Sequence, residues 1–188
     1  MTWALRIAAP GAPRALDNVR IAVVPASNQI TVYAGARWSD TTTNLFRDRL
    51  ADAFRDSGRI AALSTDESNL GADFELGGSL AAFQAEYAAG KPEVVIRYDA
   101  VLSATRKHQI VGGRRFEVHE PVDGKDVPQV VAAFEEAVSH LEAALQIVED
   151  EGVGEEHLGR LLEQLGDLMH VTGIDRRRGI RYLEQLDF

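Results

Sequence analysis

The chain has 188 residues, 45% of them hydrophobic, which is enough for one substantial core and predicts one domain with an appendage. The 29 acidic and 20 basic residues give a formal net charge of -9, which argues against a broad nucleic-acid surface and against electrostatic binding to anionic membranes. The absence of cysteine excludes disulfides, thiolate catalysis and cysteine-ligated zinc, but it does not assign a compartment. No segment is apolar enough to span a bilayer, and Arg6 and Pro10 interrupt the N-terminal apolar run. Taken alone, that N-terminus lacks a signal peptide and predicts a cytoplasmic protein.

Three short strands are expected in the first 34 residues. The weak alternation of Trp3, Leu5 and Ile7 predicts a short edge strand, because prolines and a glycine follow it directly. Alternating apolar residues predict a well-buried strand over residues 19–24 and a second short strand over residues 29–34.

A turn and the start of a helix follow within the segment Thr31–Gly58. Gly35 frees the backbone to turn, and either Ser39 or Asp40 can cap the next helix. Nothing in this segment activates a nucleophile or binds a metal, so these residues on their own indicate a structural role.

The helix itself is expected from about Asp40 to Ser57. Gly58 supplies the left-handed residue that commonly ends a helix, and extended structure resumes over residues 60–63. Strand, helix and strand in this order can form a right-handed crossover with parallel neighbours. The apolar positions of the helix recur every fourth residue, at Phe46, Leu50 and Phe54.

Residues 73–87 carry the clearest strand pattern in the chain. Alternate positions up to Leu80 are apolar or glycine, and the apolar phase then shifts by one residue, so that Phe83 begins a new register. A shift of this kind within a long strand predicts a bulge. Strand patterns over residues 94–102 and 110–119 complete an antiparallel meander.

A long amphipathic helix is expected from Asp126, its cap, to about Glu151. Its apolar stripe comprises Val127, Val130, Val131, Phe134, Val138, Leu141, Leu145 and Val148. The fold class is therefore α/β, with a mixed β-sheet, a βαβ crossover, an antiparallel meander and helices packed on the sheet. We divide the chain into an α/β domain of residues 1–151 and a C-terminal helical extension of residues 152–188.

The extension contains two further helical patterns, over residues 155–171 and 174–186. Both are amphipathic and cannot bury an apolar stripe alone, so the extension should dock on the core, on a partner, or on a second copy in a homo-oligomer. Its basic cluster, Arg176–Arg178, is typical of a solubility or ion-pair patch, with a lipid headgroup or an acidic partner as the alternative.

The search for catalytic and ligand-binding patterns is negative. The five histidines show no metal-ligand spacing, and the paired glycines match neither a P-loop nor a dinucleotide fingerprint. No serine lies in a GxSxG motif, and the adjacent carboxylates on the helices point in different directions. We therefore predict no catalytic residue, no cofactor and no metal site, and we expect the protein not to be an enzyme.

Several motifs occur in a recognisable order: VRIAVVP, YAGARWSD, RDSG, GADFELGGSLAAFQAEY, VVIRYDAVL, GRRFEV and VPQVVAAFEEAV. Over about Leu5 to Val148, this order resembles the ABC-type transport auxiliary lipoproteins, the periplasmic lipoprotein partners of MCE-type lipid transport systems in Gram-negative bacteria. The residues that carry the resemblance are Tyr33, Trp38, Asp40, Leu50, Ser57, Gly58, Asp73, Leu76, Leu80, Phe83, Glu86, Tyr87, Arg115, Phe116, Ala133, Phe134 and Ala137.

The resemblance implies a non-enzymatic component of a cell-envelope machine that moves lipid or another apolar molecule between the inner and outer membranes. It implies a periplasmic location, with an MCE-domain protein and an ABC permease and ATPase complex as partners. Family members are attached to a membrane through a lipidated cysteine at the mature N-terminus, which this chain lacks. Either the sequence is trimmed just after the lipobox, with Met1 added, or this homologue is untethered. We favour trimming, because one acyl chain accounts for membrane attachment.

Four aromatic residues are candidates for contacting a partner or a lipid: Tyr33, Trp38, Phe83 and Tyr87. Packing in the core is the alternative for each, and Tyr87, at the end of its strand, is best placed for an exposed contact. Two functions remain open. An adaptor that docks an MCE assembly to a membrane predicts a filled core and an exposed apolar or aromatic patch. A direct lipid carrier or gate instead predicts an apolar pocket of several hundred Å³.

Overall fold

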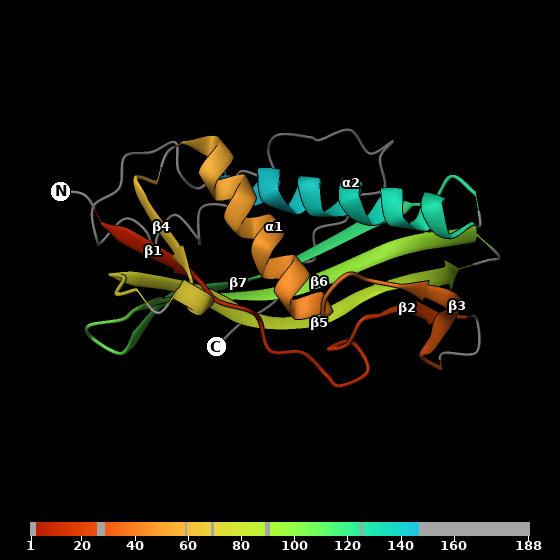
Figure 1. Ribbon diagram of the computed structural model, residues 1–188, viewed down its shortest axis with the longest axis horizontal. Coiled ribbons are helices and arrows are strands. Elements are labelled where there is room, and N and C mark those ends of the chain that lie inside the picture. The colour runs from red at the N-terminus through yellow and green to blue at the C-terminus, as the bar shows by residue number, and fades with distance from the viewer. Residues whose placement is uncertain are drawn as a thin grey trace.

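The computed structural model contains one mixed sheet of seven strands with two helices on one of its faces (Figure 1). It describes residues 3–25, 29–58, 60–68, 70–88, 91–124 and 126–146, of which the side chains of residues 88 and 142–146 are not described. In chain order the elements are β1 (Ala4–Ile7), β2 (Arg20–Val24), β3 (Thr31–Arg37), α1 (Thr42–Ser57), β4 (Ala62–Thr65), a short 3-10 helix η1 (Asp66–Ser68), β5 (Phe74–Ala88), β6 (Lys91–Ala104), β7 (Gln109–Pro121) and α2 (Val127–Gln146).

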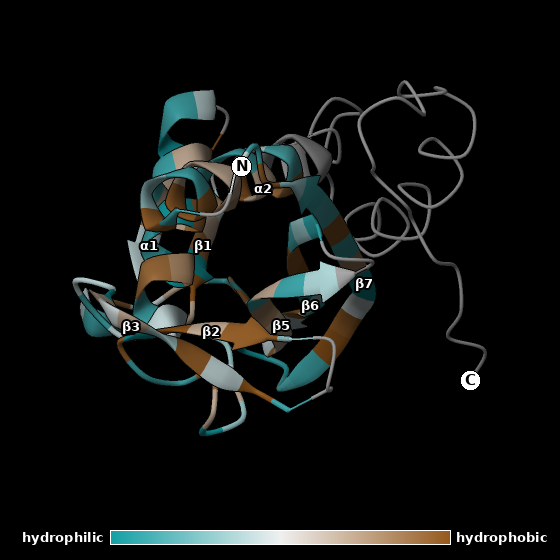
Figure 2. Ribbon diagram, turned by 90° about the vertical axis from the view of Figure 1, so that its right-hand side faces the viewer, coloured by the Kyte–Doolittle hydropathy of each residue, from teal (hydrophilic) through white to brown (hydrophobic). Residues whose placement is uncertain are grey.

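These elements confirm the predicted α/β class with a mixed sheet. The sheet curves so that β7 rises toward α2, and the two helices cover its inner face (Figure 2). The predicted end of the last helix, over residues 147–151, lies outside the described residues. The same holds for the domain boundary at residue 151 and for the whole extension, residues 152–188.

The long strand β5 organises the sheet. One of its edges pairs antiparallel with β6, which pairs antiparallel with β7, so the predicted meander is confirmed. Its other edge is shared between two strands: β1 pairs parallel with Phe74–Leu76, and β2 pairs parallel with Gln84–Glu86. β4 adds to β1, and β3 adds antiparallel to β2.

Two details of the predicted topology differ from the structure. β1 is not an edge strand, because β2 covers only the last part of β5 and leaves room for β1 between β5 and β4. The helix α1 follows β3 and precedes β4, which are not neighbours in the sheet. The parallel neighbours that the crossover joins are β2 and β5, by way of β3, α1 and β4.

The predicted bulge in β5 is confirmed. The register with β6 shifts between Leu80 and Ala82, which restores the inward direction of the apolar side chains beyond it. As a result Leu76 and Leu80 before the shift, and Phe83 after it, all belong to one buried core.

The start of α1 differs from the prediction in its cap. The N-cap residue is Thr41, in place of Ser39 or Asp40, and it makes no side-chain capping bond. The first turn is instead tied to the loop before β2, where the Thr42 hydroxyl donates to the Asn18 carbonyl (3.1 Å). Asp40 still accepts a hydrogen bond from the backbone N–H of Thr41 (2.6 Å), one residue before the helix. At the other end Gly58 adopts the predicted left-handed conformation.

Gly35 was expected to turn the chain out of the strand. It does have a positive φ of 73°, but β3 continues past it to Arg37. The pairing of β2 with β3 is irregular at this point, with a register shift between Arg20 and Ala22. Gly35 therefore allows an irregularity within the strand pair, and the strand does not end there.

The close approach of β5 and β6 depends on a glycine. Gly78 has a φ of 129°, and a Cβ atom at this position would lie 1.9 Å from the backbone oxygen of Asp99. Beside it, the buried Tyr98 hydroxyl donates to the Gly77 carbonyl (2.5 Å), and burial raises the pKa of that hydroxyl. Neither backbone nor side chain leaves room for a methyl group here.

We predict that Gly78→Ala lowers the free energy of unfolding by about 3 kcal/mol or more, because it combines a strained backbone with a clash against a main-chain atom. Urea denaturation measures the change. Gly71→Ala is the matched control, since a Cβ there meets no atom within 4 Å, and its effect should stay within about 0.5 kcal/mol. Equal effects of the two substitutions would contradict the close approach.

Candidate functional site

The four aromatic residues predicted as contacts come from two neighbouring parts of the sheet. Tyr33 lies on β3 and Trp38 follows that strand directly, whereas Phe83 and Tyr87 lie on the second half of β5. They form two pairs. The rings of Trp38 and Phe83 meet edge to face with centroids 5.9 Å apart, and the hydroxyl oxygens of Tyr33 and Tyr87 lie 3.1 Å apart.

The first pair belongs to a larger ring cluster. Phe134 of α2 stacks on Phe83 with centroids 4.6 Å apart and meets Trp38 at right angles, at 5.2 Å. Phe83 is 6% exposed and is a core residue, whereas Trp38 is half-buried. Trp38 therefore packs on the core with part of its surface and leaves the remainder accessible.

The tyrosine pair is half-buried, so Tyr87 is less exposed than its place at the strand end suggested. Burial, together with the hydrogen bond to Tyr87, raises the pKa of the Tyr33 hydroxyl well above its usual value. The hydrogen bond between the two hydroxyls links β3 to the far end of β5.

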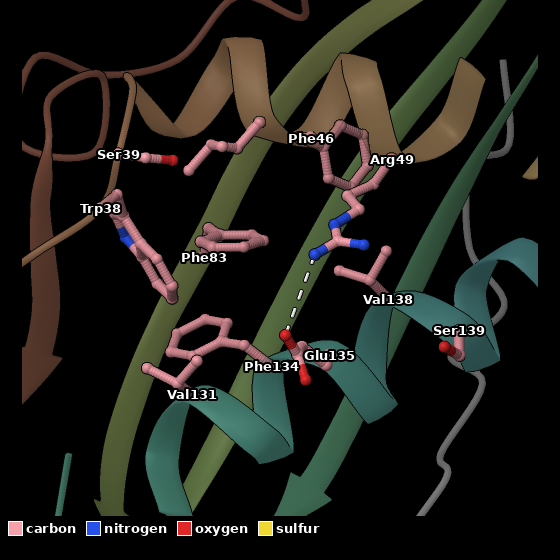
Figure 3. A pocket seen from close by; sticks show the side chains of 11 residues that line it. Trp38, Ser39, Phe46, Arg49, Phe83, Val131, Phe134, Glu135, Val138 and Ser139 are labelled. Atoms are coloured by element: carbon pink, nitrogen blue, oxygen red, sulfur yellow. Dashed lines mark ion pairs between the residues drawn. The ribbon is translucent and has the colours of Figure 1, made fainter. Parts of the chain in front are cut away.

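A cavity of about 510 Å³ lies between α1 and α2, above the ring cluster (Figure 3). We call it the helix groove. The sheet contributes Phe83, and the segment before α1 contributes Trp38 and Ser39. The remaining lining comes from the two helices: Leu45, Phe46 and Arg49 of α1, and Val131, Phe134, Glu135, Val138 and Ser139 of α2. Two of the four predicted residues, Trp38 and Phe83, line this groove.

One ion pair crosses the helix groove. The Arg49 guanidinium of α1 lies 3.8 Å from the Glu135 carboxylate of α2, and the two side chains are 61% and 65% exposed (Figure 3). Pairs this exposed typically contribute at most about 1 kcal/mol, because water screens the charges and both side chains lose freedom. The pair is therefore easily opened by anything that enters the groove.

The sequence did not identify Phe134, Arg49 or Glu135 as site residues. Phe134 was placed correctly on the apolar stripe of its helix, but periodicity shows only which face is buried. The groove depends on how far apart the two helices stand on the sheet. The sequence contained one indication of the groove. Trp38, Phe83 and Phe134 all belong to the residues that carry the family resemblance.

Two of the described histidines, His119 and His140, lie against carboxylates and are largely covered, with side chains 24% and 20% exposed. Nε2 of His119 lies 3.0 Å from Glu117, and Nδ1 of His140 lies 3.2 Å from Glu120. Within the described ranges, no three histidine, aspartate or glutamate side chains are placed to hold a metal ion. Neither of the two helices that the structure describes has the length and apolar character needed to cross a bilayer.

Comparison with solved structures finds close likeness in fold. A crystal structure of a protein of family DUF330 from Xanthomonas campestris has a TM-score of 0.73 and 30% sequence identity, covering 92% of this chain and 90% of that one. A second crystal structure, of an uncharacterised protein, has a TM-score of 0.63 and 16% identity over 77% of this chain and 91% of that chain, and shares the fold alone.

Sequence comparison points in the same direction. None of the curated proteins matches the chain. The family described as ABC-type transport auxiliary lipoprotein component matches residues 1–146, which include every described strand and both helices. The resemblance seen in the sequence is thereby confirmed, and the protein belongs to the ABC-type transport auxiliary lipoprotein components.

Proposed function

We propose that this protein is the non-enzymatic adaptor of an MCE-type ABC transport system that moves lipid or another apolar molecule between the inner and outer membranes. The observation that carries the proposal is the gathering of Tyr33, Trp38 and Tyr87, all half-buried, at the end of the sheet where β2 pairs with β3 on one side and with the last part of β5 on the other. Membership in a transport auxiliary family supports a role beside a transporter.

The chemistry of this end suits a protein contact. Tyrosine and tryptophan offer large apolar surfaces with a polar tip, and they are enriched where proteins bind one another. The strand β3 forms one end of the sheet. Its Val32 (41% exposed) points to the face opposite that of Tyr33, and Ile30, just before the strand, is 49% exposed. An apolar end of this kind gives an MCE-domain partner an anchoring surface.

The location we propose is the periplasm, with the native full-length protein held at a membrane by an N-terminal lipid anchor. Genes for an MCE-domain protein, a permease and an ATPase beside this gene would identify the partner. Their absence would count against the whole assignment.

We predict that Tyr87→Ala weakens binding to that MCE-domain partner at least about tenfold, because tyrosine is enriched among the interface residues whose truncation costs more than about 1 kcal/mol. The free energy of unfolding should fall by about 1–2 kcal/mol, because the substitution removes the hydrogen bond to Tyr33 and part of the packing of a half-buried ring. Biolayer interferometry with the purified partner measures the first effect and urea denaturation the second.

Two controls separate contact from folding. Tyr87→Phe keeps the ring and should retain binding. Ile110→Ala removes a 68% exposed apolar side chain from β7, near the opposite end of the sheet, and should leave binding unchanged. Wild-type binding by Tyr87→Ala, or an equal loss in Ile110→Ala, would count against docking through this end.

A second candidate function is favoured by the helix groove. Its volume of about 510 Å³ falls within the range of about 300–1,000 Å³ that small-molecule sites occupy, and aromatic and aliphatic side chains supply most of its lining. The protein then binds the transported lipid directly, as a carrier or gate.

Native mass spectrometry of protein purified without detergent tests this second function. A carrier should retain a copurified lipid, and Val131→Trp, which fills the groove, should reduce the bound fraction at least about tenfold, since the site loses its apolar contact area. Leu70→Trp adds the same bulk at a 61% exposed position outside the groove and should have no effect. Repeated absence of lipid from the wild-type protein would favour the adaptor.

A further inference from the structure

The helix groove has the form of a site for a third helix. Two helices lying side by side on a sheet present a trough into which the side chains of another helix can pack. Its walls carry apolar residues from both helices, including Leu45 and Val131, and Trp38 at its end is only half-buried. Among the described residues no third helix lies over this trough.

The sequence beyond α2 contains a segment with the matching pattern. Within residues 155–171 the apolar residues recur at intervals of three and four over two heptads, at Leu158, Leu161, Leu162, Leu165, Leu168 and Met169. This spacing places all six on one stripe, of the kind that packs into the trough between two other helices. In helical form the stripe would be about 17 Å long, against about 12 Å for the part of α2, Val131 to Ser139, that lines the groove.

Two glycines indicate that this segment needs a docking surface. Gly159 and Gly166 each lower helix stability by about 1 kcal/mol relative to alanine, and a helix of this length is marginal in water even without them. They are seven residues apart and therefore lie on the same side of the helix, at the flank of the leucine stripe.

The connection is long enough to bring the segment back over α2. Ser139, the last groove residue on α2, lies about 10 Å along the helix from Gln146. The eight residues 147–154 can span up to about 26 Å and include Gly152 and Gly154, which favour a reversal of direction. A short tether gives an effective concentration in the millimolar range, which favours this segment over a second copy or a separate partner.

We propose that residues 155–171 of the same chain occupy the helix groove as an amphipathic helix and cover Trp38. The groove is then closed by its own chain, and any other occupant has to displace that helix. This inference goes beyond the proposed function and does not depend on it, because it requires neither a lipid nor a transporter.

The chain offers a direct reporter for this arrangement. Its two tryptophans are Trp3 and Trp38, and Trp3 lies at the other end of the fold, where it contacts Phe74. In a full-length Trp3→Phe protein, the fluorescence therefore comes from Trp38 alone. We expect the emission to be blue-shifted and protected from acrylamide.

The test variant adds Leu161→Asp and Leu165→Asp to this full-length protein. Two charges on the stripe should release the segment, so the emission should shift to longer wavelength and quenching by acrylamide should increase. The control, Glu163→Gln with Gln164→Asp, places an aspartate on the polar side and should leave both values unchanged. Melting temperatures followed by circular dichroism check that the sheet and α2 remain folded in each variant.

Three results would overturn the proposal. Identical Trp38 fluorescence in the test variant and its parent would mean that the segment does not cover the groove. Protection that disappears on dilution, together with a dimer in analytical ultracentrifugation, would assign the groove to a second copy. Protection that disappears only after delipidation would assign it to a lipid.

Discussion

One extra residue in β5 determines the face of the sheet toward which the side chains in the second half of that strand point. The strand pairs along both edges at once, with β6 on one side and with β1 and then β2 on the other. Without the register shift between Leu80 and Ala82, every side chain beyond it would point to the opposite face, because the side-chain period of a strand is two. Phe83 would leave the core, and Phe134 would lose the ring on which it stacks.

The arrangement of the two helices depends on the ring of Phe83. Phe83 rises from the sheet between the two helices, and Phe134 and Trp38 meet at right angles beside it. Aromatic rings therefore separate α1 from α2 at this end, where direct helix contact would otherwise close the layer. The groove is the space that remains above them, and the weak pair between Arg49 and Glu135 is the charged contact across it. The register shift in β5 therefore contributes to the helix groove, because it places Phe83 at the base of that groove.

The sequence predicted the features that depend on local periodicity. The phase change at Phe83, the left-handed Gly58 and the meander of long strands each leave a mark within a short window of residues. The place of β1 beside β5 could not be predicted in this way, because it depends on how much of a distant strand edge β2 leaves open. The cap was misplaced for a similar reason. Thr42 bonds to Asn18, which is remote in sequence, so propensity alone favoured the nearer Ser39 and Asp40. The groove could not be predicted from the sequence. It depends on the distance between two helices, and no pattern within either helix indicates that distance.

The position of Trp38 connects the functional alternatives. Part of its surface packs against Phe83 and Phe134, and the remainder borders the helix groove, while the same short segment continues from β3, which carries Tyr33. A partner that binds the tyrosine pair and an occupant of the groove would therefore contact two parts of the same segment, Tyr33 on β3 and Trp38 directly after it. Since closely packed rings have few alternative arrangements, an occupant that shifts Trp38 would also shift the end of β3 to which it is joined. In this fold, docking a partner and opening the groove are therefore expected to be coupled.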